Sequence, residues 1–316
     1  MNKLKSADKS MFILPLVIIL MMVIVQSQNP NFLSPQNISN VMRQISAIAV
    51  ISFGMTFVII SGNIDLSMGS IIGFSSVLGG SIMVETGSVP LGIAVALGVG
   101  LLCGLVNGIL VALTGLHPFI VTLGTLTIFY GFAFLYTGGN LIAGLPPEFL
   151  IINTGALWVF PYAIIIAAVV FIILRFVLYK TKFGLYLYII GGRHEAAESA
   201  GLPVKACKIA AYGIMGLLSG LAGMMLTARI ITGQSDLGMG YHLIAIGCTV
   251  IGGTSLRGGR GTLGGTVLGV LIVGIMANGL NLLRVGSFWQ DVATGLIIII
   301  ALLLDTYRLR NKKQEV

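Results

Sequence analysis

Charged side chains are scarce in this chain of 316 residues, because Asp, Glu, Lys and Arg together make up 9% of it whereas 56% of the residues are hydrophobic. A water-soluble domain of this length needs far more polar surface to cover its core. The composition therefore excludes an ordinary soluble domain and predicts an integral membrane protein. The net charge of +8 does not indicate nucleic-acid binding, because the basic residues flank apolar runs instead of gathering on one soluble face.

Several motifs that carry chemistry are also missing. Cys103, Cys207 and Cys248 lie in or beside apolar stretches without CxxC spacing, so we interpret them as small buried residues rather than disulfide partners or metal ligands. No GxxxxGK[ST] motif occurs, and the glycine-rich stretch GGTSLRGGRGT lacks the lysine and hydroxyl pair that ATP and magnesium require. Because HExxH and GxSxG are missing too, an intramembrane protease or hydrolase is disfavoured.

Long apolar runs, in contrast, are present throughout. A helix needs about 20 mainly apolar residues to span a bilayer, because its backbone polar groups must be satisfied without water. Ten windows predict an all-α polytopic membrane protein of about 10 transmembrane helices, with broken or re-entrant segments near 62–70 and 233–241. The windows are residues 11 to 28, 41 to 61, 67 to 85, 89 to 113, 118 to 137, 160 to 180, 206 to 230, 240 to 257, 262 to 284 and 287 to 305.

The distribution of Lys and Arg predicts the orientation of these helices. With the N-terminus placed in the cytoplasm, only Arg43, Arg229 and Arg284 fall outside, and the other basic residues fall inside. Cytoplasmic loops of membrane proteins carry an excess of Lys and Arg. Both termini of this multi-pass chain are therefore predicted to be cytoplasmic.

The chain also resembles itself at a shift of 171 residues. This shift places GNIDLSMGS over GQSDLGMGY and Asn107 over Asn278. Because each half has five predicted helices, the two copies should have opposite orientations in the membrane, which is typical of transporters with alternating access. We predict one transmembrane domain over residues 1–316, with repeat one at about 11–137, repeat two at about 160–305 and a cytoplasmic segment at about 181–206.

The polar segment between the repeats can form a short helix. Glu195 and Glu198 suit its N-terminal part, because the helix dipole favours negative charge there. Gly201 followed by Pro203 is typical of a helix end. Such a helix is either a solvated connector or a surface that docks into a partner protein.

The sequence EAAESAG in this segment resembles the EAA-type coupling sequence of ATP-binding-cassette (ABC) importer permeases. Together with SGNIDLSMGS, GLHPFIVTLGT and GGTSLRGGRGT, it is similar to the permease subunits of bacterial monosaccharide importers of the ribose type. The likeness extends from about residue 30 to 305. One departure is that Gly201-Leu202-Pro203 comes earlier than the Ile-x-Leu-Pro ending of the general importer motif, which weakens a residue-by-residue contact map.

The resemblance implies a permease in the bacterial plasma (inner) membrane that forms the pathway for a ribose-like sugar or small polyol. The implied partners are a second permease chain, most simply an identical one, a cytoplasmic ABC ATPase and an extracytoplasmic sugar-binding protein. ATP and magnesium would be bound by the ATPase, whereas this chain would be no enzyme and would hold no cofactor or metal. The residues assigned to contact with the ATPase are Arg193, Glu195, Ala196, Ala197, Gly201, Arg257 and Arg260.

Polar side chains within the apolar windows are candidates for a sugar pathway, because amides and hydroxyls can replace water around a sugar and aromatic faces can contact its C–H surface. An asparagine can equally form a hydrogen bond between two helices. Asp65 and Asp236, which are equivalent in the repeat, can cap helix starts or act at a gate. The candidates for pathway lining are Asn107, Phe119, Thr122, Asn278, Asn281 and Gln290.

Two other classes of function compete with this interpretation. An ion-coupled secondary transporter of small polar solutes would also use inverted repeats, but it needs ionisable groups deep in the membrane, and these are nearly absent. A structural membrane protein without transport activity would leave the internal repeat unexplained.

Overall fold

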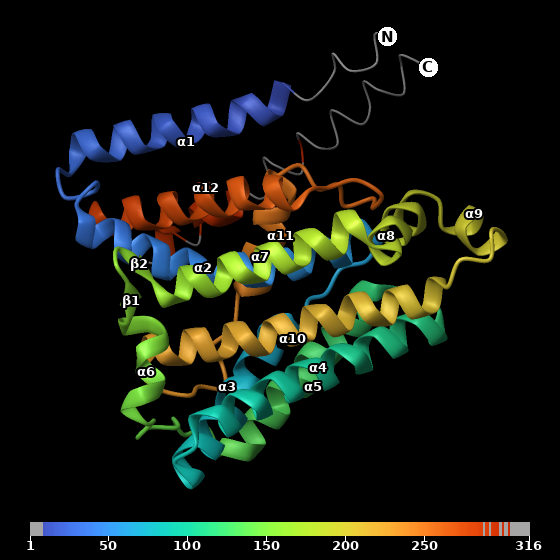
Figure 1. Ribbon diagram of the computed structural model, residues 1–316, viewed down its shortest axis with the longest axis horizontal. Helices are drawn as coiled ribbons and strands as arrows, with labels where there is room; N and C mark the ends of the chain where they lie inside the picture. Colours follow the sequence, from blue (N-terminus) through green and yellow to red (C-terminus); the bar gives the residue numbers. More distant parts are fainter. Residues whose placement is uncertain (1–8, 287, 291, 297–298, 300–302, 304–316) are drawn as a thin grey trace.

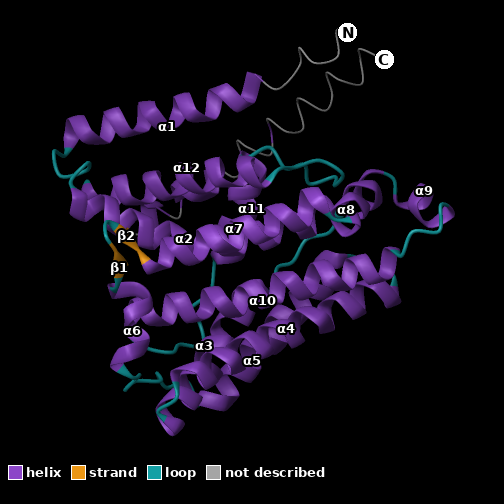
Figure 2. Cartoon of the chain, viewed as in Figure 1, coloured by secondary structure: helices purple, strands orange, loops and turns teal. Residues whose placement is uncertain are grey.

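The computed structural model describes residues 9–286, 288–290, 292–296, 299 and 303. The axes of most of the long helices are roughly aligned, and the helices form a layered bundle (Figure 1). Most of the described chain is helical, with loops and one short pair of strands between the helices (Figure 2). The all-α polytopic fold predicted from the sequence is confirmed. The helices are α1 (Lys9–Gln28), α2 (Pro35–Ile60), α3 (Met68–Thr86), α4 (Val89–Thr114), α5 (Pro118–Thr137), α6 (Pro147–Thr154), α7 (Tyr162–Lys180), α8 (Lys182–Gly192), α9 (His194–Ser199), α10 (Val204–Ile230), α11 (Tyr241–Ile251) and α12 (Leu263–Leu282).

Local sequence signals set many of the helix ends. Ser34 and Ser88 precede α2 and α4, and the hydroxyl of each accepts a hydrogen bond from a backbone N–H group of the first turn. Gly87, Gly115 and Gly138 follow α3, α4 and α5 in the left-handed conformation, which glycine adopts without steric cost. The boundaries of these helices are therefore encoded locally, whatever surrounds them.

Seven helices in the described part of the chain are long and apolar enough to span a membrane, namely α2, α3, α4, α5, α7, α10 and α12. The window from 240 to 257 was predicted too long, because α11 has only 11 residues and measures about 17 Å, which is short of a bilayer core of about 30 Å. The window from 287 to 305 falls largely outside the described residues. The predicted breaks lie in the two non-helical links, residues 61–67 and 231–240.

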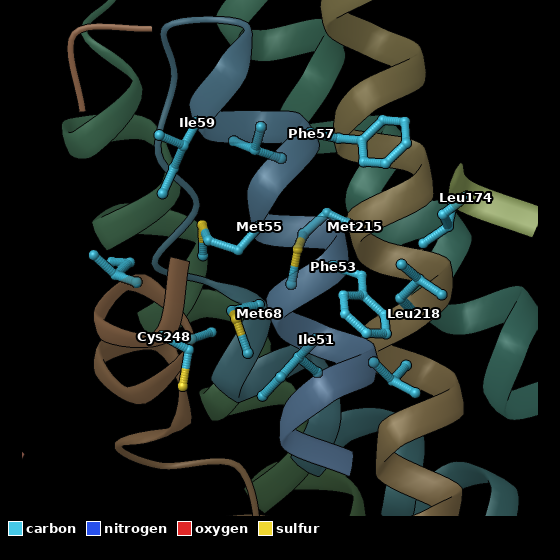
Figure 3. Packing of buried hydrophobic residues seen from close by; sticks show 14 of the residues in the cluster. Ile51, Phe53, Met55, Phe57, Ile59, Met68, Leu174, Met215, Leu218 and Cys248 are labelled. Carbon is cyan, nitrogen blue, oxygen red and sulfur yellow. The ribbon is translucent and has the colours of Figure 1, made fainter. Parts of the chain in front are cut away.

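Helix α2 is the centre of the bundle. Its residues from Ile45 to Ile60 are all buried, and the window that qualifies it as a span is 89% buried. Phe53 and Phe57 lie on the side of α2 that faces α10, near Met215 and Leu218, whereas Met68 and the free thiol of Cys248 lie on the other side of α2 (Figure 3). A helix that is apolar all round is typical of a protein core or of a membrane span, and this part of α2 is covered by other helices.

Helices α4 and α10 make the most extensive helix–helix contact in the described part of the chain. Gly100 and Gly104 of α4 face Gly216 and Gly220 of α10, and a Cβ atom added at Gly216 would lie only 2.7 Å from the Gly104 Cα. Small residues are the usual means of close packing in membranes, since lipid supplies no hydrophobic drive for helix association. The backbones of the two helices therefore touch almost directly.

Helices that are equivalent in the repeat run in opposite directions. The shift of 171 residues relates α2 to α10 and α4 to α12. Tyr212, near the start of α10, donates a hydrogen bond to the carbonyl group of Ile64, just beyond the end of α2 (2.9 Å), so these two helices are antiparallel. The paths of α4 and α12 are likewise opposite (Figure 1).

Helices α6 and α8 and strand β1 (Ala156–Leu157) have no counterpart among the predicted windows, and strand β2 (Phe160–Pro161) falls at the start of the window from 160 to 180. Helix α6 and the two-residue strands β1 and β2 form one end of the bundle. Helix α8 follows α7 after Thr181, whose hydroxyl accepts a hydrogen bond from the Gly184 N–H (3.4 Å) and caps the new helix. At 11 residues α8 is too short for a window of about 20, which is why hydropathy does not reveal it.

Candidate functional site

Helix α9 projects from one end of the bundle, between α8 and α10 (Figure 1). It has six residues, and Gly201, with a φ of 71°, forms the turn that follows it. Ala197 is completely buried, whereas Arg193, Glu195 and Ala196 are exposed. The helix is therefore attached by one side and presents charged and small side chains to its surroundings.

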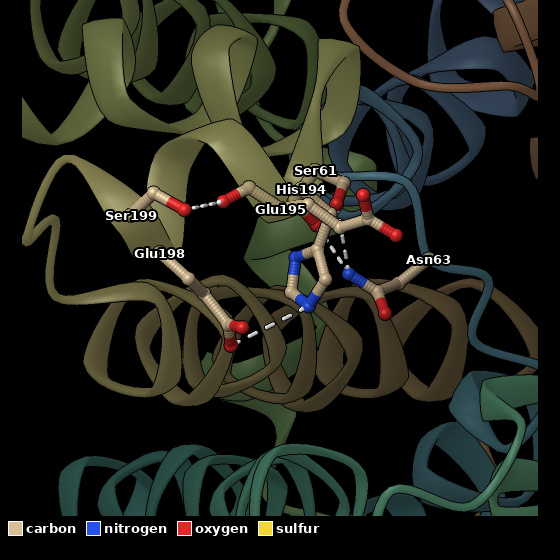
Figure 4. Close-up of polar contacts among 6 residues, drawn as sticks. All are labelled: Ser61, Asn63, His194, Glu195, Glu198 and Ser199. Atoms are coloured by element: carbon tan, nitrogen blue, oxygen red, sulfur yellow. Dashed lines mark hydrogen bonds and ion pairs between the residues drawn. The ribbon is translucent and has the colours of Figure 1, made fainter.

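Charges of both signs lie on and beside α9. His194 Nε2 is 3.6 Å from Glu198 Oε1 one turn later, and the Ser199 hydroxyl donates a hydrogen bond to the Glu195 carbonyl (Figure 4). A shallow hollow of about 390 Å³ adjoins the helix, lined by Glu198, Lys205 and the apolar residues before Lys205. An exposed surface with small side chains, mixed charge and a hollow is suited to contact with another protein.

The loop between α11 and α12 lies against the base of this region. The Gly259 N–H donates a hydrogen bond to the carbonyl of Ile60, the last residue of α2 (2.8 Å), and a Cβ atom added at Gly259 would lie 2.6 Å from the Gly192 Cα. Arg257 and Arg260, which flank this contact, are exposed. The structure thus brings the basic loop next to the segment that leads into α9.

Asp65 lies in the link between α2 and α3 and is completely buried. Its Oδ1 accepts hydrogen bonds from the backbone N–H (2.8 Å) and the hydroxyl (2.6 Å) of Ser67, immediately before α3. The Asn107 amide on α4 donates to the same hydroxyl (2.6 Å), and Tyr212 on α10 donates to the carbonyl of Ile64 (2.9 Å). Polar groups from two helices therefore converge with Asp65 on the start of α3.

Asp236, the repeat equivalent of Asp65, is exposed in the link between α10 and α11. The link between α10 and α11 nevertheless touches the start of α3, because a Cβ atom added at Gly69 would lie 2.5 Å from the Gly238 carbonyl oxygen. Ser235 donates a hydrogen bond to the carbonyl of Ala133 on α5 (3.1 Å). The two equivalent motifs thus meet, although the surroundings of their aspartates differ.

Three of the six pathway candidates are buried inside the bundle, and each has at least one hydrogen bond there, although the Asn107 Oδ1 has no partner. Asn278 on α12 forms a reciprocal amide pair with Asn37 on α2, with distances of 2.9 and 3.0 Å. Asn107 is bonded to Ser67, and the Thr122 hydroxyl donates to a carbonyl of its own helix. The candidates that retain partial or full exposure are Phe119, Asn281 and Gln290.

Several residues that shape this end of the molecule were not singled out by the sequence. The Tyr188 hydroxyl on α8 donates to the Gly261 carbonyl (2.8 Å), and the Leu263 N–H donates to the Tyr179 hydroxyl (3.3 Å). These bonds join segments more than 70 residues apart, so no local pattern reveals them. The available signal is the pair of adjacent glycines in each segment, Gly191-Gly192 and Gly258-Gly259, because adjacent glycines are typical of close backbone approach.

Within the described ranges, no group of three or more His, Cys, Asp or Glu side chains is placed to hold a metal ion. Cys103, Cys207 and Cys248 are free and buried. The prediction that they are small core residues agrees with their packing.

Most of the length of the chain matches known proteins. Residues 37–302 match the family described as "Branched-chain amino acid transport system / permease component". The chain is 44% identical to the ribose import permease protein RbsC of Bacillus subtilis (strain 168) over 288 residues, which cover 90% of this chain and 89% of that protein. No solved structure matches the chain.

Two further relatives are named for other sugars. The L-arabinose ABC transporter permease protein AraH of Azospirillum brasilense is 38% identical over 90% of this chain and 84% of its own length. The galactose/methyl galactoside import permease protein MglC of Haemophilus influenzae is 33% identical over 94% of each chain. Permeases of this kind are transport subunits, and ATP hydrolysis belongs to a separate subunit of the importer. The chain therefore belongs to the family of multi-pass inner-membrane permease subunits of ABC importers.

Proposed function

We propose that this chain forms the membrane pathway of an importer for a monosaccharide. The observation that carries the proposal is the 44% identity to a ribose import permease over 90% of the chain, supported by the relatives named for L-arabinose and galactose. The family description names branched-chain amino acids instead, so the class of solute is the point to test.

Helix α9 is proposed as the coupling helix that docks into the ATPase. Its exposed residues, its position outside the bundle and the hollow beside it support this role. The exposed Arg257 and Arg260 lie at the same end and would contribute to the same contact. ATP and magnesium would be bound by the ATPase alone.

The proposed orientation of the chain in the membrane rests on how Lys and Arg residues are divided between the two ends of the bundle. Arg43, whose guanidinium donates to the Thr154 carbonyl of α6, lies at the end opposite α9, as do Arg229 after most of α10 and Arg284 beyond α12. The more numerous basic residues beside α9 mark the cytoplasmic end. The extracytoplasmic sugar-binding protein would therefore dock at the end that carries α6.

The complete importer is proposed to contain two permease chains, most simply two identical copies. Phe119, Asn281 and Gln290 are the candidates most available to a passing sugar in this conformation, because their side chains retain exposure. Asn107, Thr122 and Asn278 are buried, so they would reach the sugar only after the helices around them move apart. Asp65 and Asp236 stay candidates for a helix end and a gate.

The solute class is tested with the complete importer, purified with its ATPase and binding protein. D-Ribose, L-arabinose, D-galactose and L-leucine are each offered, and the rate of ATP hydrolysis and the uptake into vesicles are measured. We expect at least one sugar to stimulate both and leucine to stimulate neither. Stimulation by leucine alone would overturn the proposal.

The docking role of α9 is tested with Ala196→Trp, because Ala196 is exposed whereas Ala197 is buried, so the added ring disturbs the docking face rather than the bundle. Asn140→Trp, an exposed position in the loop after α5, is the control. The ATPase should co-purify with the control and be lost from Ala196→Trp. Normal co-purification and uptake in Ala196→Trp would show that α9 does not dock.

A further inference from the structure

Glycines from three separate segments meet at the base of α9. Gly62 follows α2, Gly191 is near the end of α8, and Gly258 and Gly259 belong to the loop between α11 and α12. A Cβ atom added at Gly258 would lie 2.8 Å from both the Gly191 carbonyl oxygen and the Gly62 Cα. One added at Gly191 would overlap the Ile60 carbonyl oxygen and lie 2.6 Å from the Gly259 nitrogen. The three segments therefore pack backbone on backbone, with no flexible side chain between them.

Hydrogen bonds fix the same contact from several directions. The Gly259 N–H donates to the Ile60 carbonyl (2.8 Å), and the Tyr188 hydroxyl on α8 donates to the Gly261 carbonyl (2.8 Å). The loop is closed on itself by the Ser255 N–H, which donates to the Arg260 carbonyl (3.1 Å). A displacement of α8 must therefore carry the loop and the end of α2 with it, because direct backbone contacts have little freedom to yield.

Helix α9 is joined differently to the helices on its two sides. On its upstream side the Arg193 N–H donates to the Ile189 carbonyl (3.0 Å), which continues the hydrogen bonding of α8 up to α9. On its downstream side the Leu202 N–H donates to the Ala197 carbonyl (3.1 Å), but Gly201 turns the chain with a φ of 71° and α10 begins only after Pro203. The continuous hydrogen bonding makes α8 the more direct route for a push on α9.

The glycine contact adjoins α2 and the loop before α12, and both of these helices lie in the middle of the bundle. Residues 45–60 of α2 are all buried, and α12 is bonded to α2 through the Thr56 and Thr266 hydroxyls (2.8 Å) and through the Asn37–Asn278 amide pair. A shift that enters at the end of α2 and at the loop before α12 therefore reaches the middle of the bundle.

We infer that this four-glycine contact, formed by Gly62, Gly191, Gly258 and Gly259, is the junction through which movement of α9 is passed to α2 and to the α11–α12 pair. The inference rests on the proposed coupling function of α9. It makes Gly191 a positioning residue, which contacts neither the sugar nor ATP. A larger residue there should separate ATP hydrolysis from sugar movement without preventing either partner from binding.

Adjacent glycines on α8 provide the variant and its control. Gly191→Ala forces a methyl group into the junction, whereas a Cβ atom added at Gly192 has only the Gly259 Cα near it, at 4.0 Å. The readout is the number of D-ribose molecules imported per ATP hydrolysed by the complete importer in vesicles, or of another sugar if that one is transported. We expect this ratio to fall about tenfold or more in Gly191→Ala and to stay within about twofold of wild type in Gly192→Ala.

An unchanged ratio of sugar imported to ATP hydrolysed in an assembled Gly191→Ala importer would overturn the inference, even if the rates of import and of hydrolysis both fall. A junction needed only for folding or turnover would leave that ratio intact.

If Gly191→Ala fails to assemble, the same ratio is measured for Tyr188→Phe, which loses the hydrogen bond to the Gly261 carbonyl. Tyr186→Phe is the control, since no hydrogen bond of the Tyr186 hydroxyl is found in the described part of the chain. A lowered ratio in Tyr188→Phe alone supports the junction, and equal ratios in both variants refute it. A wild-type importer without ATP-dependent uptake would instead refute the proposed function.

Discussion

The contact between α4 and α10 predicts opposite effects for two glycines that are two residues apart. A Cβ atom added at Gly100 would overlap the Gly216 carbonyl oxygen and lie 2.9 Å from the Gly220 nitrogen and 3.0 Å from its Cα. One added at Gly98 meets no atom within 4 Å. Gly100→Ala must therefore push the two helices apart, whereas Gly98→Ala changes only the helix itself.

The magnitudes follow from two terms. Overpacking a tight contact costs about 1–3 kcal/mol, and replacing a helical glycine by alanine stabilises a helix by up to about 1 kcal/mol. Gly98→Ala gains the second term alone, so it should be neutral or more stable than wild type. Gly100→Ala carries both terms, so it should be about 1–3 kcal/mol less stable than Gly98→Ala.

The three buried cysteines provide the assay. Cys103, Cys207 and Cys248 are each at most 6% exposed, so a thiol-reactive dye reports their release when the protein unfolds in detergent. With both variants heated at one scan rate, the apparent Tm of Gly100→Ala should lie several degrees below that of Gly98→Ala, at about 2–4 °C per kcal/mol. Equal apparent Tm values would refute the packing argument.

Two further predictions concern buried hydrogen bonds. Replacing Asn278 by Leu leaves the buried Asn37 Oδ1 without its donor at a cost of about 1–3 kcal/mol, although the Asn37 Nδ2 still donates to the Phe32 carbonyl (2.8 Å). The double variant Asn37→Leu/Asn278→Leu should therefore be less destabilised than the two single variants add up to, as a double-mutant cycle would measure; strict additivity would contradict it. Ser67→Ala removes the hydroxyl that accepts a hydrogen bond from the Asn107 amide, whereas Ser70→Ala removes a hydroxyl that donates only to the nearby Ser67 carbonyl. The apparent Tm should therefore fall more in Ser67→Ala than in Ser70→Ala, and a larger fall in Ser70→Ala would contradict this prediction.

Hydropathy and local signals predict most of the helices, because spanning segments need apolar length and helix ends need particular residues. The packing partners are another matter. Gly98 and Gly100 are indistinguishable in the sequence, yet only Gly100 touches α10, since the contact depends on the rotation of α4 within the bundle. The length of α11 was also missed, because the predicted window ran on over the residues from Gly252 to Leu256, which carry no charge, whereas the helix ends at Ile251 and Gly253 has a φ of 89°.

The candidate site was predictable in part. The short helix at α9 and its end at Gly201 follow from the residue pattern, and the structure contains both. The contact of Gly191 and Gly192, at the end of α8, with the loop at Gly258 and Gly259 was not predictable from the sequence. Backbone contacts between segments 67 residues apart leave no periodicity in the sequence. The repeat related Asn107 to Asn278, but their partners differ because Ser67 has Gly238 as its equivalent, which offers no hydroxyl.

The central claim is that this chain conducts a sugar only when a separate ATPase drives it through α9. Vesicles containing the purified chain alone, and vesicles containing the complete importer with its binding protein, are compared for uptake of radiolabelled D-ribose, L-arabinose and D-galactose with and without Mg-ATP. The account predicts uptake of at least one sugar only by the complete importer with Mg-ATP. Uptake by the chain alone, without nucleotide, would contradict it.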